Sequence, residues 1–224
     1  MTTRFTTRIF AAAICAAAIA SAPAQVAADA NAGYRTKDAR EKIVGRLLAH
    51  DREDTQKPND LVEAMSIAPN MTVVDIGTGA GFMLPYLYGA LGDGGKLIAE
   101  DIFPDFLEKA KARAAEAQLE NVTFIHGTEK DPKLPPAGVD VALILDAYHH
   151  FDYPADMLAG VRRGLKDNGR LILVDFYKRG FQDPKHIRAD EAEVVREVEA
   201  AGFVLIATRP FTPDRQYIAE FKKK

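Results

Sequence analysis

A glycine-rich segment follows a short β-branched run in the first half of the chain. The run ends at Asp75, and glycines then occupy the alternate positions 77, 79 and 81 before an apolar stretch. This order predicts a strand, a tight turn and a helix N-terminus, with glycines that let a ligand approach the backbone. A simple tight turn rarely uses three alternate glycines after a strand-terminal acid. We therefore predict that Asp75, Gly77, Thr78, Gly79 and Gly81 bind a ligand.

Strand signals alternate with amphipathic helical stretches along the rest of the chain. The expected strands are 72–76, 96–101, 122–126, 139–146, 170–175, 203–208 and 216–221. Helices are expected over about 38–50, from 59 or 60 to 65, and between successive strands. The alternation predicts an α/β fold with a doubly wound, mostly parallel sheet of seven strands. We expect one domain over 29–224, with an N-terminal helical lid over 29–66 and the sheet core over 67–224.

The residues that end each strand are the candidates for a binding site, because ligands of an open α/β sheet bind beyond the carboxyl ends of its strands. The second strand ends in Glu100 and Asp101, and a carboxylate there can accept both hydroxyls of a ribose. Side chains alternate along a strand, so one acid should face the site and the other the opposite side. A one-residue shift would exchange them. The alternative is that the acid caps the helix that begins near Pro104.

Polar groups also follow the later strands. Thr128 and Glu129 come after the third strand, and Asp146, His149 and His150 come after the fourth. Adjacent histidines are potential metal ligands, but side chains one position apart diverge, and no second pair is spaced to complete a site. The sequence therefore predicts no metal site.

The D-x-G-x-G-x-G spacing resembles motif I of the class I S-adenosylmethionine-dependent methyltransferases, whereas dinucleotide folds use G-x-G-x-x-G. The later pattern of strand, acid, two residues, His-His, helix and Leu-Lys-x-x-Gly-Arg is similar to small-molecule members of that family. The resemblance covers roughly residues 56–221 and implies S-adenosylmethionine as the cofactor and an antiparallel last strand. It also implies that Asp101, which precedes an Ile-Phe-Pro step, binds the ribose. By the same resemblance Thr128 or Glu129 contacts the adenine, and Asp146 belongs to the cofactor site.

The resemblance implies transfer of a methyl group to a small-molecule acceptor, with a hydroxyl as the expected nucleophile. A hydroxyl benefits from a general base, and His149 and His150 are the candidates. The alternative is that one histidine packs beneath the cofactor and the other caps the next helix. Substrate contacts are expected from polar loop residues: Arg52, Gln56, Lys57, His186, Arg188, Arg215, Gln216 and Tyr217.

Two other functions remain open. The first is a non-catalytic protein that binds S-adenosylmethionine. The second is a nicotinamide-dependent dehydrogenase, which the glycine spacing and the lack of a Tyr-x-x-x-Lys pair disfavour.

The first 28 residues have the layout of a secretory signal peptide. Arg4 and Arg8 precede an apolar run over 9–20, and small residues then offer cleavage sites after Ala24 and Ala28. The apolar run is shorter than the roughly 20 helical residues that span a bilayer. We therefore expect a periplasmic or secreted protein without a stable membrane span after cleavage. An uncleaved anchor and a misassigned start codon are the alternatives.

The net charge of the chain indicates which class of partner to expect. Removing Arg4 and Arg8 from 29 basic residues leaves 27 against 32 acidic residues, a formal charge of −5. A nucleic-acid binder needs a basic face instead. The Asn-Pro-Pro-Tyr motif of DNA amino-methyltransferases is also absent. We expect a small-molecule substrate and no nucleic acid, and the sequence leaves the oligomeric state open.

Overall fold

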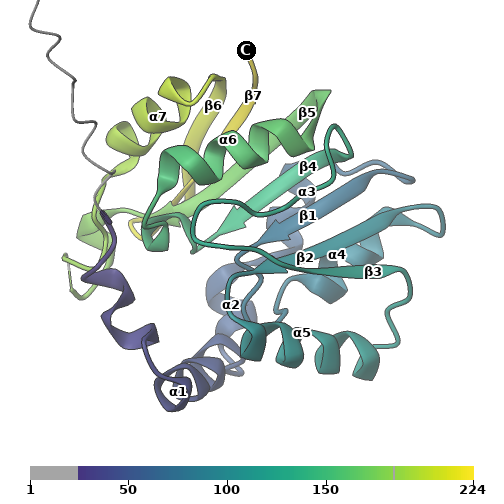
Figure 1. Cartoon of the computed structure of the whole chain (residues 1–224), viewed down its shortest axis with the longest axis horizontal. Coiled ribbons are helices and arrows are strands. Elements are labelled where there is room, and N and C mark those ends of the chain that lie inside the picture. The colour runs from purple at the N-terminus through teal and green to yellow at the C-terminus, as the bar shows by residue number, and fades with distance from the viewer. Residues whose placement is uncertain (1–24, 184) are drawn as a thin grey trace, which may run out of the picture.

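The strands form one sheet whose order confirms the predicted architecture. The computed structural model describes residues 25–183 and 185–224, so the predicted signal peptide lies outside the described residues except for its last four positions. The sheet has the order β3-β2-β1-β4-β5-β7-β6 (Figure 1). Its strands are β1 (Thr72–Ile76), β2 (Lys96–Asp101), β3 (Val122–His126), β4 (Val139–Leu145), β5 (Leu165–Phe176), β6 (Phe203–Thr212) and β7 (Gln216–Lys223). The first five strands pair in parallel, and β7 runs antiparallel to both β5 and β6.

The predicted strand boundaries hold best in the amino-terminal half of the sheet. β1, β2 and β3 match the predicted ranges residue for residue. β4 ends one residue early because Asp146 adopts a left-handed backbone with φ +52°, which cannot continue a strand. β5, β6 and β7 are longer than predicted. β5 begins at Leu165, which pairs with Val139 of β4, and β6 and β7 pair with one another beyond the predicted ends.

Helices cover both faces of the sheet. The helices are α1 (Lys37–Leu47), α2 (Arg52–Gln56), α3 (Pro58–Met65), α4 (Leu84–Leu91), α5 (Pro104–Glu116), α6 (Pro154–Gly164) and α7 (Glu191–Ala200). Short 3-10 turns are η1 (Ala30–Tyr34), η2 (Tyr148–His150) and η3 (Lys178–Gly180). No helix among the described residues is long and apolar enough to cross a membrane.

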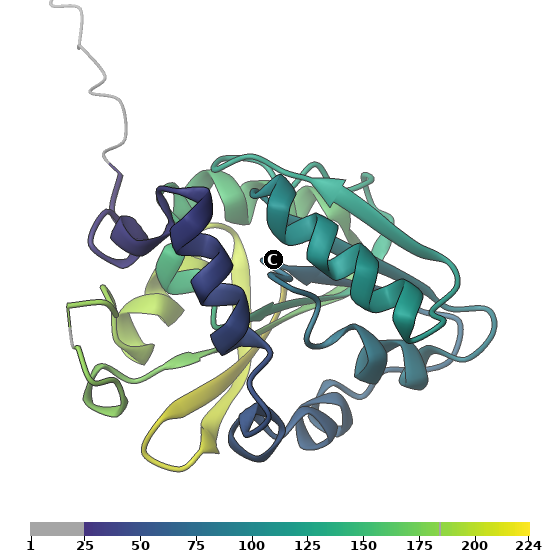
Figure 2. The same ribbon diagram turned by 90° about the horizontal axis from the view of Figure 1, so that it is seen from below.

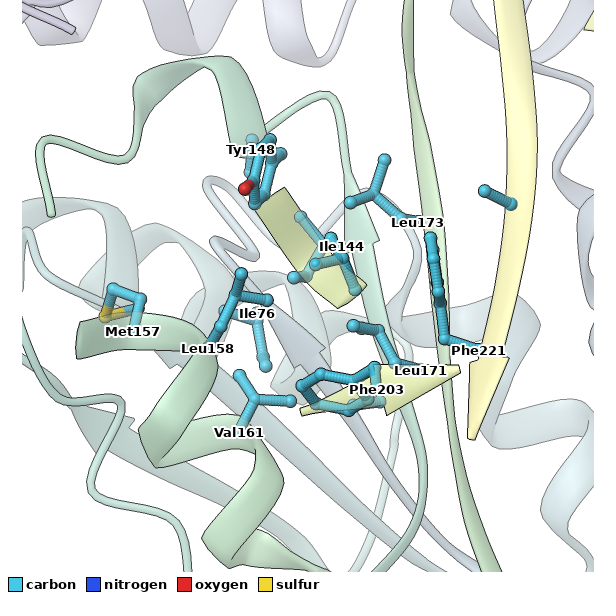
Figure 3. Close-up of a cluster of buried hydrophobic side chains, with 14 of the residues drawn as sticks. Ile76, Ile144, Tyr148, Met157, Leu158, Val161, Leu171, Leu173, Phe203 and Phe221 are labelled. Carbon is cyan, nitrogen blue, oxygen red and sulfur yellow. The ribbon is translucent and has the colours of Figure 1, made fainter. Parts of the chain in front are cut away.

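Alternation along the buried strands divides the core into two layers. Val73 packs with α3, α4 and α5 on one face, whereas its neighbour Val74 packs with α6 and α7 on the other. Figure 3 shows the second layer, in which Leu158 of α6 lies against the strand residues Ile76 and Ile144. Leu158 is fully buried. Burying such a side chain contributes about 1.5–3 kcal/mol, so these layers fix the strand ends that carry the site.

The amino-terminal helix α1 packs beside α5 (Figure 2). Ile43 and Val44 contact Phe106 and the glycine turn, and Arg40 forms an ion pair with Asp105 at 2.8 Å. The helix ends at Leu47, three residues before the predicted end, and the short helix α2 lies between the two predicted helices. These contacts place the amino-terminal helices over the carboxyl ends of the strands.

The start of α3 differs from the prediction. Pro58 is the first helical residue, and Lys57 precedes it with a left-handed φ of +50°. The expected caps, Asn59 and Asp60, therefore lie inside the first turn. Proline is favourable at this first position because it needs no amide hydrogen bond there.

Candidate active site

An open cavity of roughly 820 Å³ lies beyond the carboxyl ends of β1, β2 and β4. Its amino-terminal wall comes from Asn31, Tyr34, Leu47 and Arg52. The predicted site residues among its lining are Gly77, Thr78, Gly79, Glu100, Asp101, Glu129, Asp146 and His150. Asp75, Gly81, Thr128 and His149 are not among the described residues that line it.

The glycine turn needs its glycines for two different reasons. Gly77 has φ +70°, and a Cβ there would lie 2.7 Å from the Cβ of Ala147, so a side chain would strain the backbone and block the turn. Gly81 has φ +78°, and a Cβ would meet Leu84 and Ala110. Gly77 therefore borders the cavity, whereas Gly81 lets the turn pack closely on α5.

Asp75 supports the turn from below. Its side chain is 3% exposed, and its Oδ2 accepts a hydrogen bond from the Thr78 hydroxyl at 2.7 Å. Burial raises the pKa of Asp75 to about 6, although the bond from Thr78 opposes this. The structure thus gives Asp75 a positioning contact within the turn.

Asp101 lies at the cavity with both carboxylate oxygens fixed by backbone amides. Oδ2 accepts from the Gly79 amide at 2.9 Å, and Oδ1 accepts from the Phe103 amide at 2.9 Å. Burial raises the pKa of Asp101 to about 6. Each oxygen still has a lone pair, so an ionised Asp101 can accept hydroxyl groups of a ligand in a fixed orientation.

Glu100 also lines the cavity, although strand alternation predicted that it would point to the opposite side. Its Oε1 is buried and has no hydrogen-bond partner among the described residues. Burial, followed by the charge of Asp101, raises the pKa of Glu100 well above 4.5. A Cβ at Gly127 would collide with this oxygen, so the glycine makes room for it. An orphaned buried acceptor beside a second carboxylate suits a ligand that brings hydroxyl donors.

The loop after β3 presents Glu129 to the cavity. The hydroxyl of Thr128 instead accepts a hydrogen bond from the Asp131 amide at 3.0 Å and stabilises its own turn. Of the two residues predicted to contact adenine, the structure therefore places Glu129 at the cavity. Phe103 and Phe106 supply an apolar wall beside it.

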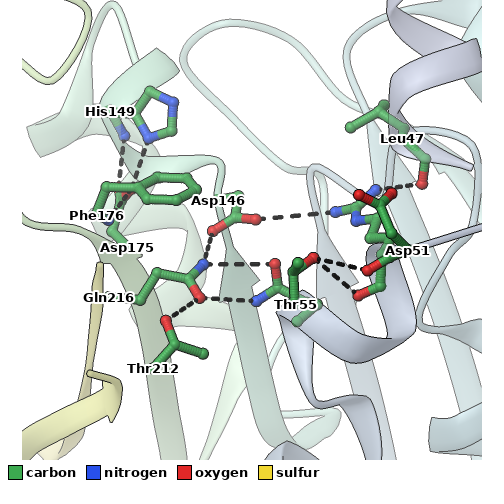
Figure 4. A network of polar contacts seen from close by, with 11 residues as sticks. Leu47, Asp51, Thr55, Asp146, His149, Asp175, Phe176, Thr212 and Gln216 are labelled. Carbon is green, nitrogen blue, oxygen red and sulfur yellow. Dashed lines mark hydrogen bonds and ion pairs between the residues drawn. The ribbon is translucent and has the colours of Figure 1, made fainter. Parts of the chain in front are cut away.

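Asp146 joins the end of β4 to the amino-terminal helices (Figure 4). Its Oδ1 accepts from Gln216 Nε2 at 2.6 Å, and its Oδ2 lies 3.9 Å from Arg52 Nη2. Burial raises the pKa of Asp146 to about 6, and the Arg52 charge works against the rise. Arg52 Nη1 also donates to the Leu47 carbonyl at 2.6 Å, so this cation is held at the cavity wall.

The other residues predicted to contact substrate are dispersed. Gln56 is buried against Gln216 at 3.4 Å, and Lys57 is exposed outside the cavity. Arg188 pairs with Glu197 at 2.7 Å, Arg215 is exposed, and Tyr217 is buried in the core. His186 lies beside the histidines of η2.

His149 is held by a buried carboxylate at the end of β5. Its backbone amide donates to Asp175 Oδ2 at 3.0 Å, and its Nδ1 lies 2.6 Å from Asp175 Oδ1 (Figure 4). A carboxylate accepts hydrogen bonds, so Nδ1 carries the ring proton and Nε2 keeps its lone pair. The geometry therefore orients one basic nitrogen of His149.

His150 is held by the amino-terminal turn η1, which the sequence did not predict. Asn31 donates through Nδ2 to the His150 carbonyl at 3.0 Å and to Asp152 Oδ2 at 3.1 Å, which turns its Oδ1 toward His150 Nδ1 at 2.9 Å. Nδ1 therefore donates and Nε2 is again free. Burial lowers the pKa of His150 well below 6.5, so its ring is neutral at pH 7.

The comparisons with known proteins agree with this geometry. Residues 67–216 match a protein family described as methyltransferase domain. The chain belongs to this methyltransferase family. A solved S-adenosylmethionine-dependent methyltransferase from Aquifex aeolicus has a TM-score of 0.78 and 26% identity, over 83% of this chain and 98% of that one.

Curated methyltransferases are similar over shorter stretches. The uncharacterized methyltransferase YcgJ of Bacillus subtilis is 31% identical over 133 residues, or 52% of this chain and 50% of that protein. The ubiquinone/menaquinone biosynthesis C-methyltransferase UbiE of Ectopseudomonas mendocina is 26% identical over 120 residues, or 53% and 47%. The chain thus spans about half the length of these curated relatives.

The methyltransferase family implies S-adenosylmethionine as the cofactor, in place of a nicotinamide dinucleotide. The cavity fits that molecule, because the orphaned Glu100 oxygen and the fixed Asp101 carboxylate suit the ribose diol. The apolar wall of Phe103 and Phe106 suits the adenine ring.

Proposed function

We propose that this protein transfers the methyl group of S-adenosylmethionine to the hydroxyl of a small molecule. The observation that carries the proposal is the buried pair of His149 and Asp175, because His149 lies against His150, which lines the cavity. A buried carboxylate that holds one ring nitrogen orients the other and stabilises the imidazolium that forms when it takes a proton. The calculated mature charge of −5 argues against a nucleic-acid acceptor.

Different residues of the cavity bind different parts of the cofactor in this proposal. Asp101 and Glu100 accept the ribose hydroxyls, and Glu129 accepts from the adenine amino group. Arg52 and Asp146 lie at the opposite side of the glycine turn, where their charges suit the carboxylate and the amino group of the methionine part. When bound, S-adenosylmethionine supplies an electrophilic methyl group on a positively charged sulfur.

His149 performs the proton chemistry in this proposal. Its Nε2 would take the proton of the acceptor hydroxyl, and the oxygen could then receive the methyl group that bound S-adenosylmethionine would supply. General-base catalysis typically contributes about 100- to 10,000-fold. His150 lines the cavity with its ring centroid 4.2 Å from that of His149, so it is the second candidate for the same task.

A turnover assay with the full chain tests this function. The acceptors are a panel of small phenols, amines and thiols, and the readouts are release of the demethylated cofactor and the mass and methylation site of the product. We expect turnover with hydroxyl acceptors and methylated oxygen in the product. His149→Ala should reduce turnover at least 100-fold with little change in cofactor affinity, and His126→Ala is the matched control.

Three results would contradict the proposal. Methylation of carbon, the chemistry named for the UbiE relative, would refute the oxygen assignment. Tight cofactor binding without turnover on any acceptor would favour a non-catalytic binding protein. Unchanged turnover in both His149→Ala and His150→Ala would show that neither histidine acts as the general base.

We also propose that the protein is exported after cleavage behind Ala24. The support is that Ala27 is 1% exposed and its amide donates to Asp152 Oδ1 at 3.3 Å, so cleavage behind Ala28 would remove a packed segment. Intact mass of protein from a secretion-competent host tests this. A mature chain that begins at Gln25 is expected, and a full-length chain retained in the cytosol would overturn the proposal.

A further inference from the structure

Three histidine side chains meet at one edge of the cofactor cavity. His149 and His150 come from η2 after β4, and His186 comes from the loop between η3 and α7. One ring nitrogen of each lies within 4.8 Å of the others. The ring centroids of His149 and His150 are 4.2 Å apart, and His186 lies 5.1 Å from each. The expectation that adjacent histidines diverge is therefore wrong for this pair.

The hydrogen bonds around the cluster leave ring lone pairs without donors. Asp175 occupies Nδ1 of His149, and Asn31 occupies Nδ1 of His150, so both Nε2 atoms are acceptors. Among the described residues, no donor is bonded to either Nε2. A neutral imidazole nitrogen with a lone pair is the form of histidine that binds a metal ion.

The partners of these rings are typical of metal centres. A metal-bound histidine usually donates its second ring N–H to a carboxylate or another oxygen, which fixes the tautomer and orients the ring. Asp175 does this for His149 from a site that is 2% exposed, and its charge would offset that of a cation. Asn31 does the same for His150 through an amide whose orientation is fixed by two further bonds.

We propose that His149, His150 and His186 bind one divalent transition-metal ion of the zinc type through one ring nitrogen each. Neutral imidazole is the ligand that Zn²⁺ and its neighbours prefer, and three histidines with one open position form a known zinc geometry. Ligands at 2.0–2.1 Å around a tetrahedral ion lie about 3.3 Å apart. The observed spread of at most 4.8 Å therefore requires a closure of about 1.5 Å, and half-exposed His186 in its loop can supply it.

The open coordination position would let the metal bind the acceptor, and this role rests on the proposed function. His150 also lines the cofactor cavity, so the hydroxyl of the acceptor can reach the ion as its fourth ligand. A cation lowers the pKa of a bound hydroxyl, so the hydroxyl would lose its proton to water in the open cavity and the oxygen would react as the anion. In the metal-bound protein the ion would activate the hydroxyl in place of the Nε2 of His149, which acts as the base in the metal-free protein.

Metal titration of the full chain, purified without a polyhistidine tag and stripped with a chelator, tests the site. Zn²⁺ alone is followed by calorimetry, and Co²⁺ alone by the intense visible absorption of a four-coordinate ion. We expect one equivalent of each metal. His186→Ala should weaken Zn²⁺ binding at least tenfold, and Asp175→Asn should weaken it about 10- to 100-fold.

Two controls make the result decisive. His126→Ala removes a histidine outside the cluster and should leave Zn²⁺ affinity unchanged. S-adenosylmethionine affinity, measured without metal on His186→Ala, should equal that of the parent chain, because His186 does not line the cofactor cavity.

Absence of one-equivalent binding, or equal Zn²⁺ affinity in the parent chain and His186→Ala, would overturn the metal site. Metal binding without methyl transfer would overturn only the proposed function.

Discussion

Replacing Asp101 by asparagine should separate cofactor binding from stability. Both carboxylate oxygens accept backbone amides, from Gly79 and Phe103, and the charge is the acceptor assigned to the ribose hydroxyls. Hydrogen bonds to charged groups contribute about 1.5–3 kcal/mol, so Asp101→Asn should weaken S-adenosylmethionine binding by that amount. This corresponds to about a 10- to 150-fold rise in Kd.

The same substitution should leave stability almost unchanged at pH 7. A pKa raised from 3.8 to about 6 means that ionised Asp101 costs the folded state about 3 kcal/mol, which a neutral amide avoids. The amide nitrogen of asparagine must face one of the two backbone donors, and losing that hydrogen bond costs about 1–3 kcal/mol. The two effects oppose one another, so the melting temperature should shift by only a few degrees.

Calorimetry with S-adenosylmethionine and thermal unfolding measure the two quantities. Asp140→Asn is the matched control, because Asp140 accepts the Thr72 amide at 2.8 Å at the opposite end of the sheet. The control should keep the parent cofactor affinity. Parent affinity in Asp101→Asn would refute the assignment of Asp101, and a large loss of stability there would refute the opposing-effects argument.

Four further predictions concern the same cavity. Glu100→Gln should keep cofactor affinity within about threefold at pH 7 in a calorimetric titration, since burial raises the pKa of Glu100 and an amide oxygen can accept the same hydroxyl; a tenfold loss would show that its charge is needed. Gly77→Ala should abolish measurable cofactor binding while circular dichroism remains native, and retained binding would contradict the close approach at this turn. Cofactor affinity should fall by up to about tenfold per pH unit below 6, because only ionised Asp101 accepts the hydroxyls, and a flat profile from pH 5 to 7.5 would contradict this. Without cofactor, the pKa values of Asp75, Asp101 and Asp146 in the folded state lie above their ordinary value. Their contribution to stability should therefore be lost as pH rises from 4 to 6 in denaturant titrations, and stability that rises over this range would contradict the prediction.

The sequence predicted the parallel part of the sheet well, for a local reason. β1 and β2 are short apolar runs, and turn residues and charged groups bound them. These features lie in or next to each strand, so the local sequence shows them. The strand ends then located eight of the twenty residues that line the cavity. The early start of β5 and the late end of β7 were not predictable, because Leu165 pairs with Val139 of β4 and Lys222 pairs with Arg170 of β5, which are distant in the sequence.

The histidine cluster was not predictable for the same reason. The expectation that His149 and His150 diverge considered only neighbours along one chain segment. In the structure Asp175, 26 residues away, orients one ring, and Asn31, 119 residues away, orients the other. The position of the Glu100 side chain was also not predictable from the local sequence. The side chain has space because residue 127, in the loop after the neighbouring strand β3, is glycine. Contacts across the fold, rather than local pattern, decide these positions.

Calorimetric titration of the full chain with S-adenosylmethionine, beside an identical titration with NADH, tests the central claim most directly. The claim is that the cavity beyond β1, β2 and β4 is the cofactor site of a methyltransferase. We predict one equivalent of S-adenosylmethionine, bound more tightly than NADH and weakened by Asp101→Asn. Tighter binding of NADH, or no saturable binding of S-adenosylmethionine, would contradict the account.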